Sequence, residues 1–168
     1  MKKKLLISFA LFVWFSQSAL AQLSTAVLVQ IVRAEDERRY DKTLENLLLS
    51  PDAQIRARAA LAVGRIGDER SIPALADLLD KDSDTVREMA AFAVGEIESA
   101  KGADIILKTL ENEKNSAAVR ARSLEAAGKI GAAIATADKK KSDELGEAIL
   151  EAIEFERSQP KPDKQLIL

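Results

Sequence analysis

Residues 55–80 read IRARAALAVGRIGDERSIPALADLLD, and this stretch decides the fold. Apolar and small side chains recur in steps of three and four at Ile55, Ala59, Ala62, Val63 and Ile66. This spacing indicates one buried face of a helix, because side chains three and four apart lie on the same side. A second apolar helix is expected at 71–80, with a proline in its first turn, where a missing N–H has no consequence.

The first half of this pattern returns twice. The segment 55–67, IRARAALAVGRIG, is followed by VREMAAFAVGEIE at 86–98 and VRARSLEAAGKIG at 119–131, at intervals of 31 and 33 residues. Each copy has an arginine in its second position and a glycine in its tenth. These structural repeat positions are Arg56, Arg87 and Arg120, and Gly64, Gly95 and Gly128. Repeats of this length, each a pair of helices, predict an all-α solenoid.

The segments between the first helices complete the repeat. The segment ADIILKTLEN at 103–112 corresponds to the second helix at 71–80, and short polar turns at 50–54 and 81–85 precede the first helices. Asp52 and Asp84 are expected to cap the helices that follow them. A partial copy in residues 35–48 adds a further unit, with 22–33 as its degenerate first helix. The prediction is about four stacked helix pairs over residues 22–157.

The pattern resembles the HEAT-like repeats of the phycobilisome-lyase type. The marks that carry the resemblance are the Ile/Val-Arg pair that opens each first helix, the Ala-Val-Gly-x-Ile or Ala-Ala-Gly-x-Ile close, and the preceding aspartate. The run RAEDERRYDKTLENLLLSPDAQIRARAALAVGRIGDERSIPAL at 33–75 is also similar to repeats beside cyclophilin-type peptidyl-prolyl isomerase domains of exported bacterial proteins. The resemblance implies an α-solenoid, and such solenoids serve many functions.

The recurring glycine suggests how the repeats pack. Glycine in a helix costs about 1 kcal/mol relative to alanine. Its return at one position in three repeats predicts that neighbouring first helices approach closely there. The recurring arginines are expected to pair with the acidic turns at Asp52, Asp82 and Asp84 and so to join neighbouring units, rather than to form an anion-binding ladder.

The first 21 residues have the character of an export signal. Three lysines at 2–4 precede an apolar run at 5–15, and Ala19-Leu20-Ala21 has the pattern of a cleavage site. The alternative, a membrane anchor, needs about 20 apolar residues, and the run at 5–20 is shorter. Cleavage before Gln22 and a periplasmic or secreted location are therefore expected, with no membrane attachment afterwards.

Composition narrows the classes of function. Without residues 1–21 the chain has 22 basic and 27 acidic residues, and its remaining aromatics are Tyr40, Phe92 and Phe155. An acidic chain with few aromatics disfavours nucleic-acid binding, which needs clustered cations and stacking surfaces. The chain has no histidine and no cysteine, so it lacks the commonest metal ligand and general base. No cofactor is expected, and no catalytic residue is identified.

The expected function is that of a non-catalytic scaffold which binds a protein partner. Its partner-binding candidates are Arg38, Arg39 and Tyr40, because Arg and Tyr are enriched among interface anchors. They are expected on the face formed by the second helices, and the alternative for Tyr40 is packing beneath the first repeat. The second hypothesis is that the chain is an N-terminal repeat module of a cyclophilin-type isomerase, inactive without its barrel.

The last predicted helix carries Glu144, Glu147, Glu151 and Glu154 at steps of three and four. A carboxylate stripe could bind a hard cation, but a solvated helix face is the favoured interpretation. Residues 158–168, SQPKPDKQLIL, form a proline-containing tail, and its last residues resemble the start of a further helix. Two alternatives stay open for the tail: an array that continues, or a frayed end.

Overall fold

The structure, a computed structural model, describes residues 23–160, which contain helices and no strand. The helices are α1 Thr25–Asp36, α2 Lys42–Leu48, α3 Ala53–Ile66, α4 Ile72–Lys81, α5 Asp84–Ile97, α6 Ala103–Glu111, α7 Ala117–Ile134 and α8 Lys139–Ser158. Short 3-10 turns, η1 Glu69–Ser71 and η2 Ala100–Gly102, precede α4 and α6. The prediction of an all-α fold is confirmed. The proposed signal peptide at 1–21 and residues 161–168 of the tail lie outside the described residues.

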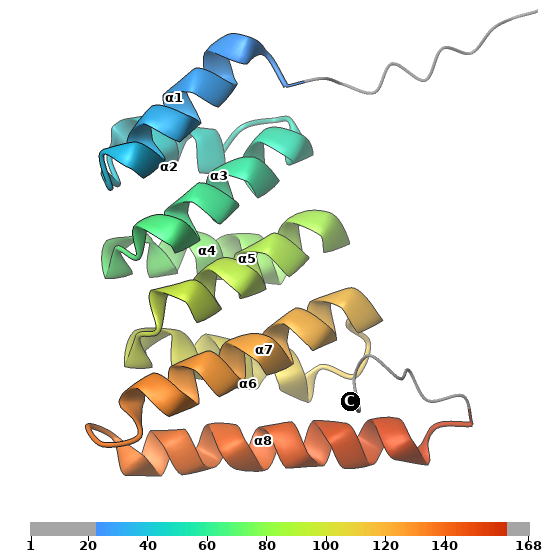
Figure 1. Cartoon of the computed structure of the whole chain (residues 1–168). Coiled ribbons are helices and arrows are strands. Elements are labelled where there is room, and N and C mark those ends of the chain that lie inside the picture. The colour runs from blue at the N-terminus through green and yellow to red at the C-terminus, as the bar shows by residue number, and fades with distance from the viewer. Residues whose placement is uncertain (1–22, 161–168) are drawn as a thin grey trace, which may run out of the picture.

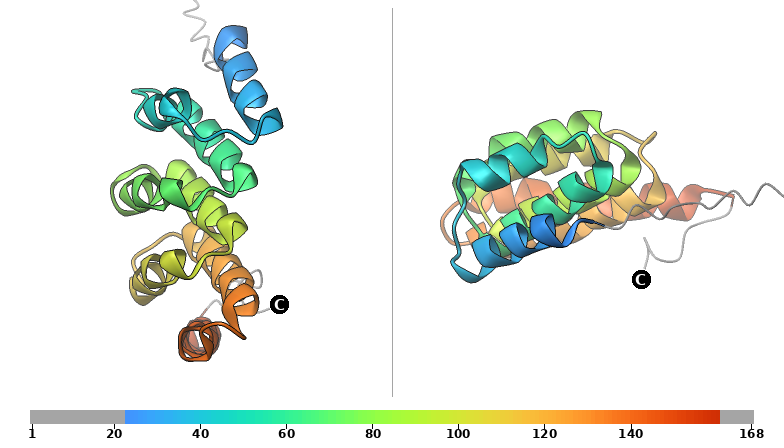
Figure 2. Two further views of the ribbon diagram at one scale, coloured as in Figure 1. Left: turned by 90° about the vertical axis from the view of Figure 1, so that its left-hand side faces the viewer. Right: turned by 90° about the horizontal axis from the view of Figure 1, so that it is seen from above.

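The helices form four antiparallel pairs that stack in chain order (Figure 1). The first helices α1, α3, α5 and α7 form one layer, and the second helices lie beside them in the other (Figure 2). Packing is most extensive from α3 to α5 and from α5 to α7, whereas consecutive second helices touch only lightly. The solenoid predicted from the repeat is therefore present, and its first helices form the tighter layer.

The core lies between the two layers and is almost entirely aliphatic. The second helices contribute Leu44, Leu48, Leu75, Leu79 and Ile106, all at most 2% exposed. The first helices contribute buried alanines, valines and isoleucines, including Ala59, Val63, Ala90, Val94 and Ile130. Small residues lie where two first helices meet, and large residues fill the space between the layers. The alanine-rich composition of the first helices thus follows from the short distance between them.

Helix ends are set by local side chains, with one departure from expectation. Asp52 caps α3 as predicted, because its Oδ1 accepts a hydrogen bond from the N–H of Gln54 at 2.8 Å. Asp84 does not cap α5: it is the first residue of the helix, and Ser83 occupies the cap position. A residue already in helical conformation is one position too late for that role. At the other end of α3, Gly67 has a φ of 76°, the left-handed conformation that commonly ends helices.

Two of the three recurring glycines lie at close helix contacts. A Cβ atom on Gly64 would lie 2.7 Å from the Cα of Ala93, and one on Gly95 would lie 2.8 Å from the Cα of Ala126. Gly128 does not follow this pattern, since it is exposed and a Cβ there would meet nothing within 4 Å. The expectation of close packing at Gly128 is wrong, because no further first helix packs on α7 in the described residues.

Candidate functional site

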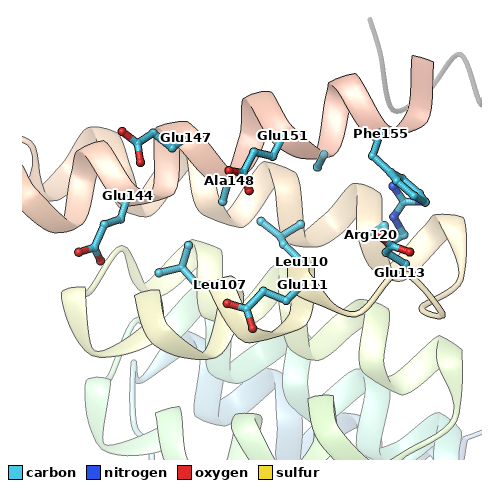
Figure 3. Close-up of a pocket in the computed structure, with 11 residues that line it drawn as sticks. Leu107, Leu110, Glu111, Glu113, Arg120, Glu144, Glu147, Ala148, Glu151 and Phe155 are labelled. Carbon is cyan, nitrogen blue, oxygen red and sulfur yellow. The ribbon is translucent and has the colours of Figure 1, made fainter. Parts of the chain in front are cut away.

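A cleft lies between α6 and α8, the last two second helices, and has a volume of about 510 Å³ (Figure 3). It arises from a mismatch in length, because α6 has 9 residues and α8 has 20. The longer helix continues past the end of α6 and over the turn that leads into α7. The lining residues are Leu107, Leu110, Glu111, Glu113, Arg120, Glu144, Glu147, Ala148, Glu151, Ala152 and Phe155.

The floor of the cleft is apolar. Leu107 and Leu110 of α6 face Ala148 of α8 across the gap in Figure 3. Ala152 and Phe155 of α8 also line the cleft. All five are partly buried, so the apolar surface is neither sealed in the core nor fully exposed. Their spacing of three and four residues explains why they share one face of each helix. An apolar surface of this kind gains stability when a ligand removes it from water.

Carboxylates surround this floor. Glu111 and Glu113 lie at the end of α6 and in the following turn, and Glu144, Glu147 and Glu151 lie along α8 (Figure 3). Glu144 accepts a hydrogen bond from the Nζ of Lys141 at 2.7 Å, and this contact lowers the pKa of its carboxyl group. The other four carboxylates form no ion pair with any residue that the structure describes.

The one cation among the lining residues is already engaged. Arg120 of α7 donates a hydrogen bond to Oε2 of Glu156 at 3.0 Å, and both side chains are at most 10% exposed. The guanidinium carbon of Arg120 also lies 4.9 Å from the centre of the Phe155 ring. These contacts fasten the C-terminal half of α8 to α7. They also leave the carboxylates of the cleft without a compensating charge from Arg120.

A second attachment holds the other end of α8. Lys141 lies 2.8 Å from Oδ1 of Asp104 on α6, and Ser142 donates a hydrogen bond to the carbonyl of Gly131 at 2.9 Å. The cleft therefore occupies the part of α8 between its contacts at 141–142 and at 156. About 14 residues separate these contacts, or roughly 21 Å of helix at 1.5 Å per residue.

The recurring arginines connect consecutive repeats. Arg56 binds both carboxylate oxygens of Asp82, each at 2.6 Å, and also donates to the carbonyl of Ser50 at 2.7 Å. Arg87 donates to the carbonyl of Leu79 at 2.8 Å and to the side chain of Asn115. Arg56 thus joins the turn before α3 to the turn after α4, and Arg87 joins the last turn of α4 to the turn after α6. The hydrogen bond from Arg56 lowers the pKa of Asp82.

The contacts of the second and third recurring arginines differ in part from the expected pairing with acidic turns. Arg87 binds the neutral side chain of Asn115 as well as Asp84, and Arg120 binds Glu156 of α8 instead of a turn residue. Asp52 caps its own helix and forms no ion pair in residues 23–160, whereas Asp84 lies 3.4 Å from Arg87. No local pattern in the sequence marked Glu156 as the partner of Arg120, since the two are 36 residues apart.

The predicted partner-binding residues Arg38, Arg39 and Tyr40 lie in the turn between α1 and α2, not on a second helix. Tyr40 is 8% exposed and belongs to the core, which corresponds to the packing alternative. Arg38 has a φ of 46° and donates to the carbonyl of Ile66 at 2.8 Å. Arg39 is exposed and forms ion pairs with Glu37 and Asp41. Of the three, Arg38 and Arg39 are exposed and Tyr40 is buried.

The four glutamates of the stripe on α8 differ in their position relative to the cleft. Glu144, Glu147 and Glu151 line the cleft and Glu154 does not, while Glu147, Glu151 and Glu154 are all exposed. A solvated face therefore describes three of the four glutamates, and only Glu144 is partly buried. Sequence reasoning missed Glu111, Glu113 and Phe155 as neighbours of that stripe. The available signal was the repeat itself, because stacked repeats place the end of α6 beside α8.

The described residues hold no group of three or more carboxylates arranged to bind a metal ion. Among residues 23–160, no helix is both long enough and apolar enough to cross a membrane.

Comparison with known proteins supports the repeat assignment. Residues 18–91 match the family described as HEAT repeats. The match covers somewhat less than half of the chain and ends inside α5, and the helix pairs continue beyond it with the same order of contacts. No curated protein matches the sequence. The fold is therefore a HEAT-like α-solenoid of stacked helix pairs.

Proposed function

We propose that this chain is a non-catalytic scaffold, exported from the cytoplasm, that binds a partner protein in the cleft between α6 and α8. The observation that carries the proposal is the partly exposed apolar floor of the cleft, bordered by four carboxylates without ion-pair partners in residues 23–160. HEAT-type repeats commonly present extended surfaces for protein binding, and stacked repeats produce such surfaces as a consequence of their geometry.

The chemistry of the cleft supports binding rather than catalysis. Its polar groups are carboxylates and one guanidinium, and that guanidinium is held by Glu156. A site that uses a serine, threonine, cysteine or lysine nucleophile would need that side chain beside a base that activates it. The lining residues contain no serine, threonine, cysteine, histidine or lysine. Apolar and acidic surface is what the cleft presents to a ligand.

Export is supported by the sequence of residues 1–21, which combines a lysine-rich start, an apolar run and a small-residue cleavage pattern. The absence of cysteine is compatible with an oxidising compartment, since no free thiol is present to react there. Fractionation of the expressing cells, with mass spectrometry of the N-terminus, tests this part. A chain that begins at Gln22 in the exported fraction is the expected result, and an intact cytoplasmic chain would contradict it.

The alternative role is a repeat module of a longer cyclophilin-type peptidyl-prolyl isomerase, by the similarity of residues 33–75. This role requires a strand-rich catalytic barrel, and residues 23–160 contain no strand. Peptidyl-prolyl isomerase assays on the 168-residue chain should then give no activity under either role. Activity above the uncatalysed rate in the purified chain would contradict both.

Site-specific photo-crosslinking tests the proposed function. A photoreactive amino acid at position 147 places the probe at the cleft, and one at position 36 places it on the exposed surface of α1. We expect a discrete crosslinked partner from position 147 and none of the same mass from position 36. Equal crosslinking from the two positions, or none from position 147, would refute the cleft as the binding site.

A further inference from the structure

We infer that the cleft between α6 and α8 binds a basic amphipathic helix of a partner protein, with lysine or arginine side chains beside an apolar stripe. This inference rests on the proposed function and adds the chemistry of the partner. It is carried by the charge and the shape of the cleft together.

The charge of the cleft is unusual for this molecule. Elsewhere on the surface, carboxylates are mostly held in ion pairs, as with Glu35 between Arg58 and Arg65, or Glu125 between Arg122 and Lys129. In the cleft, Glu111, Glu113, Glu147 and Glu151 have no ion-pair partner within the part of the chain that the structure describes. Uncompensated charges of one sign attract a ligand of the other, raising the rate of association and excluding acidic ligands.

The carboxylates are spread along the cleft and do not converge on one point. Glu147 and Glu151 are four residues apart on α8, which corresponds to roughly 6 Å along the helix axis. A single metal ion would need three or more of these groups around it, and residues 23–160 contain no such arrangement. Charges spaced in this way fit a ligand whose positive groups are also spaced, such as basic residues three or four apart on a helix.

The apolar floor distinguishes a helix from a simple polycation. Leu107, Leu110 and Ala148 lie among the carboxylates, and Phe155 lies at the end of the cleft beside Arg120 (Figure 3). A ligand that only carried charge would leave this surface in water. A volume of about 510 Å³ receives a few side chains and not a whole helix. The partner helix therefore lies over the cleft and inserts the side chains of its apolar stripe.

The cleft is held open without a ligand. Lys141 joins α8 to Asp104 of α6 at one end, and Arg120 joins α8 to α7 through Glu156 at the other. Because α8 is attached at both ends, these contacts oppose movement of its middle onto α6. A preformed site loses less conformational entropy on binding than one that must first be ordered.

A second copy of this chain is a poorer occupant. Its most arginine-rich helix, α3, has Arg56, Arg58 and Arg65 engaged in ion pairs with Asp82 and Glu35. The lysines at the start of α8 are likewise paired within the chain. A separate protein that presents unpaired basic residues fits the cleft better.

Fluorescence anisotropy with a labelled peptide of about 18 residues tests the inference. The probe has leucines on one face of a helix and lysines on its flanks, and a matched peptide replaces every lysine with glutamate. We expect the intact protein to bind the lysine peptide and not the glutamate peptide. Binding should weaken several-fold between about 50 and 300 mM salt, because salt screens exposed charges.

Matched variants locate the binding. Glu147→Gln together with Glu151→Gln should weaken binding by about fivefold, since two exposed ion pairs of about 0.5 kcal/mol each sum to about 1 kcal/mol. Asp36→Asn together with Glu98→Gln removes the same charge from exposed carboxylates that lie away from the cleft and likewise form no ion pair in residues 23–160. This control should bind within a factor of two of the original protein. Equal loss in both double variants would refute the inference.

Two further outcomes separate this inference from the proposed function. If position 147 crosslinks a partner but the lysine peptide does not bind, the scaffold role stands and the basic-helix inference fails. If neither occurs, both fail. Spermine provides a third comparison, because it carries spaced charges without an apolar face. Spermine that binds as tightly as the peptide would show that the apolar floor is not used, and would overturn the inference.

Discussion

Gly64 of α3 lies directly against the backbone of Ala93 of α5, so that a Cβ atom at position 64 would fall 2.7 Å from the Cα of Ala93. Gly95 of α5 has the same relationship with Ala126 of α7, one repeat later. Neither neighbour can yield by rotating a side chain, because the obstructing atom belongs to the main chain. These contacts set the separation of the first helices.

Alanine at position 95 should therefore destabilise the protein by about 1–3 kcal/mol through overpacking. Alanine at position 128 should stabilise it by up to about 1 kcal/mol, because Gly128 meets nothing within 4 Å and alanine favours the helix. Urea denaturation followed by circular dichroism compares the two variants. Similar changes of stability in both would show that the contact at Gly95 is not tight.

The pair formed by Arg56 and Asp82 should make stability depend on pH. Hydrogen bonds from Arg56 hold the pKa of Asp82 below the usual 3.8, despite partial burial. A lowered carboxyl pKa contributes stability above pH 4, and this contribution is lost as the pH falls through the folded-state pKa. Asp82→Asn should cost about 2 kcal/mol at pH 7. It should also flatten the decline in melting temperature between pH 4 and pH 2.5, and an unchanged acid profile would argue against this role.

Glu156 should be required to hold the end of α8. Its side chain is 7% exposed and accepts a hydrogen bond from Arg120, which is itself 10% exposed. Glu156→Gln should cost about 3 kcal/mol, because a largely buried guanidinium then lacks a charged partner. Hydrogen exchange should quicken at residues 150–158 more than in α3. Unchanged protection of α8 would mean that other contacts suffice.

Alanine substitutions at Tyr40 and Arg39 should have opposite effects on stability and partner binding, although the two residues are adjacent. Tyr40→Ala should cost about 3 kcal/mol by leaving a cavity in the core, since Tyr40 is 8% exposed. Arg39→Ala should change stability by less than about 0.5 kcal/mol, because its ion pairs are exposed. Thermal melts and partner crosslinking on both variants separate a packing role from a binding role. A stable Tyr40→Ala variant that lost its partner would restore Tyr40 as a binding residue.

The sequence predicts the parts of this fold that repeat. The spacing of Ile55, Ala59, Val63 and their counterparts encodes the first helices, and Asp52 marks the start of α3 correctly. These features depend on residues within one or two helical turns. A single sequence with internal copies therefore contains enough information to assign them.

The cleft could not be predicted in the same way, because it arises where the repeat changes. α8 is longer than its counterparts, and its contacts with Asp104 and Arg120 cross 37 and 36 residues. The exposure of Gly128 has the same origin, since its counterparts are buried only by a following first helix. Local spacing shows that Gly128 occupies the repeat position, but it does not show whether a neighbour covers it.

The contrast between the two layers has a mechanical consequence. The first helices are locked at fixed separations by main-chain contacts at Gly64 and Gly95, while consecutive second helices touch only lightly. The layer of first helices should therefore resist changes in helix separation, and the layer of second helices should permit them. We expect the softest deformation of the stack to be a change of curvature that spreads or gathers α2, α4 and α6. The cleft between α6 and α8 should change least in such bending, because α8 is attached to Asp104 at one end and to Arg120 at the other.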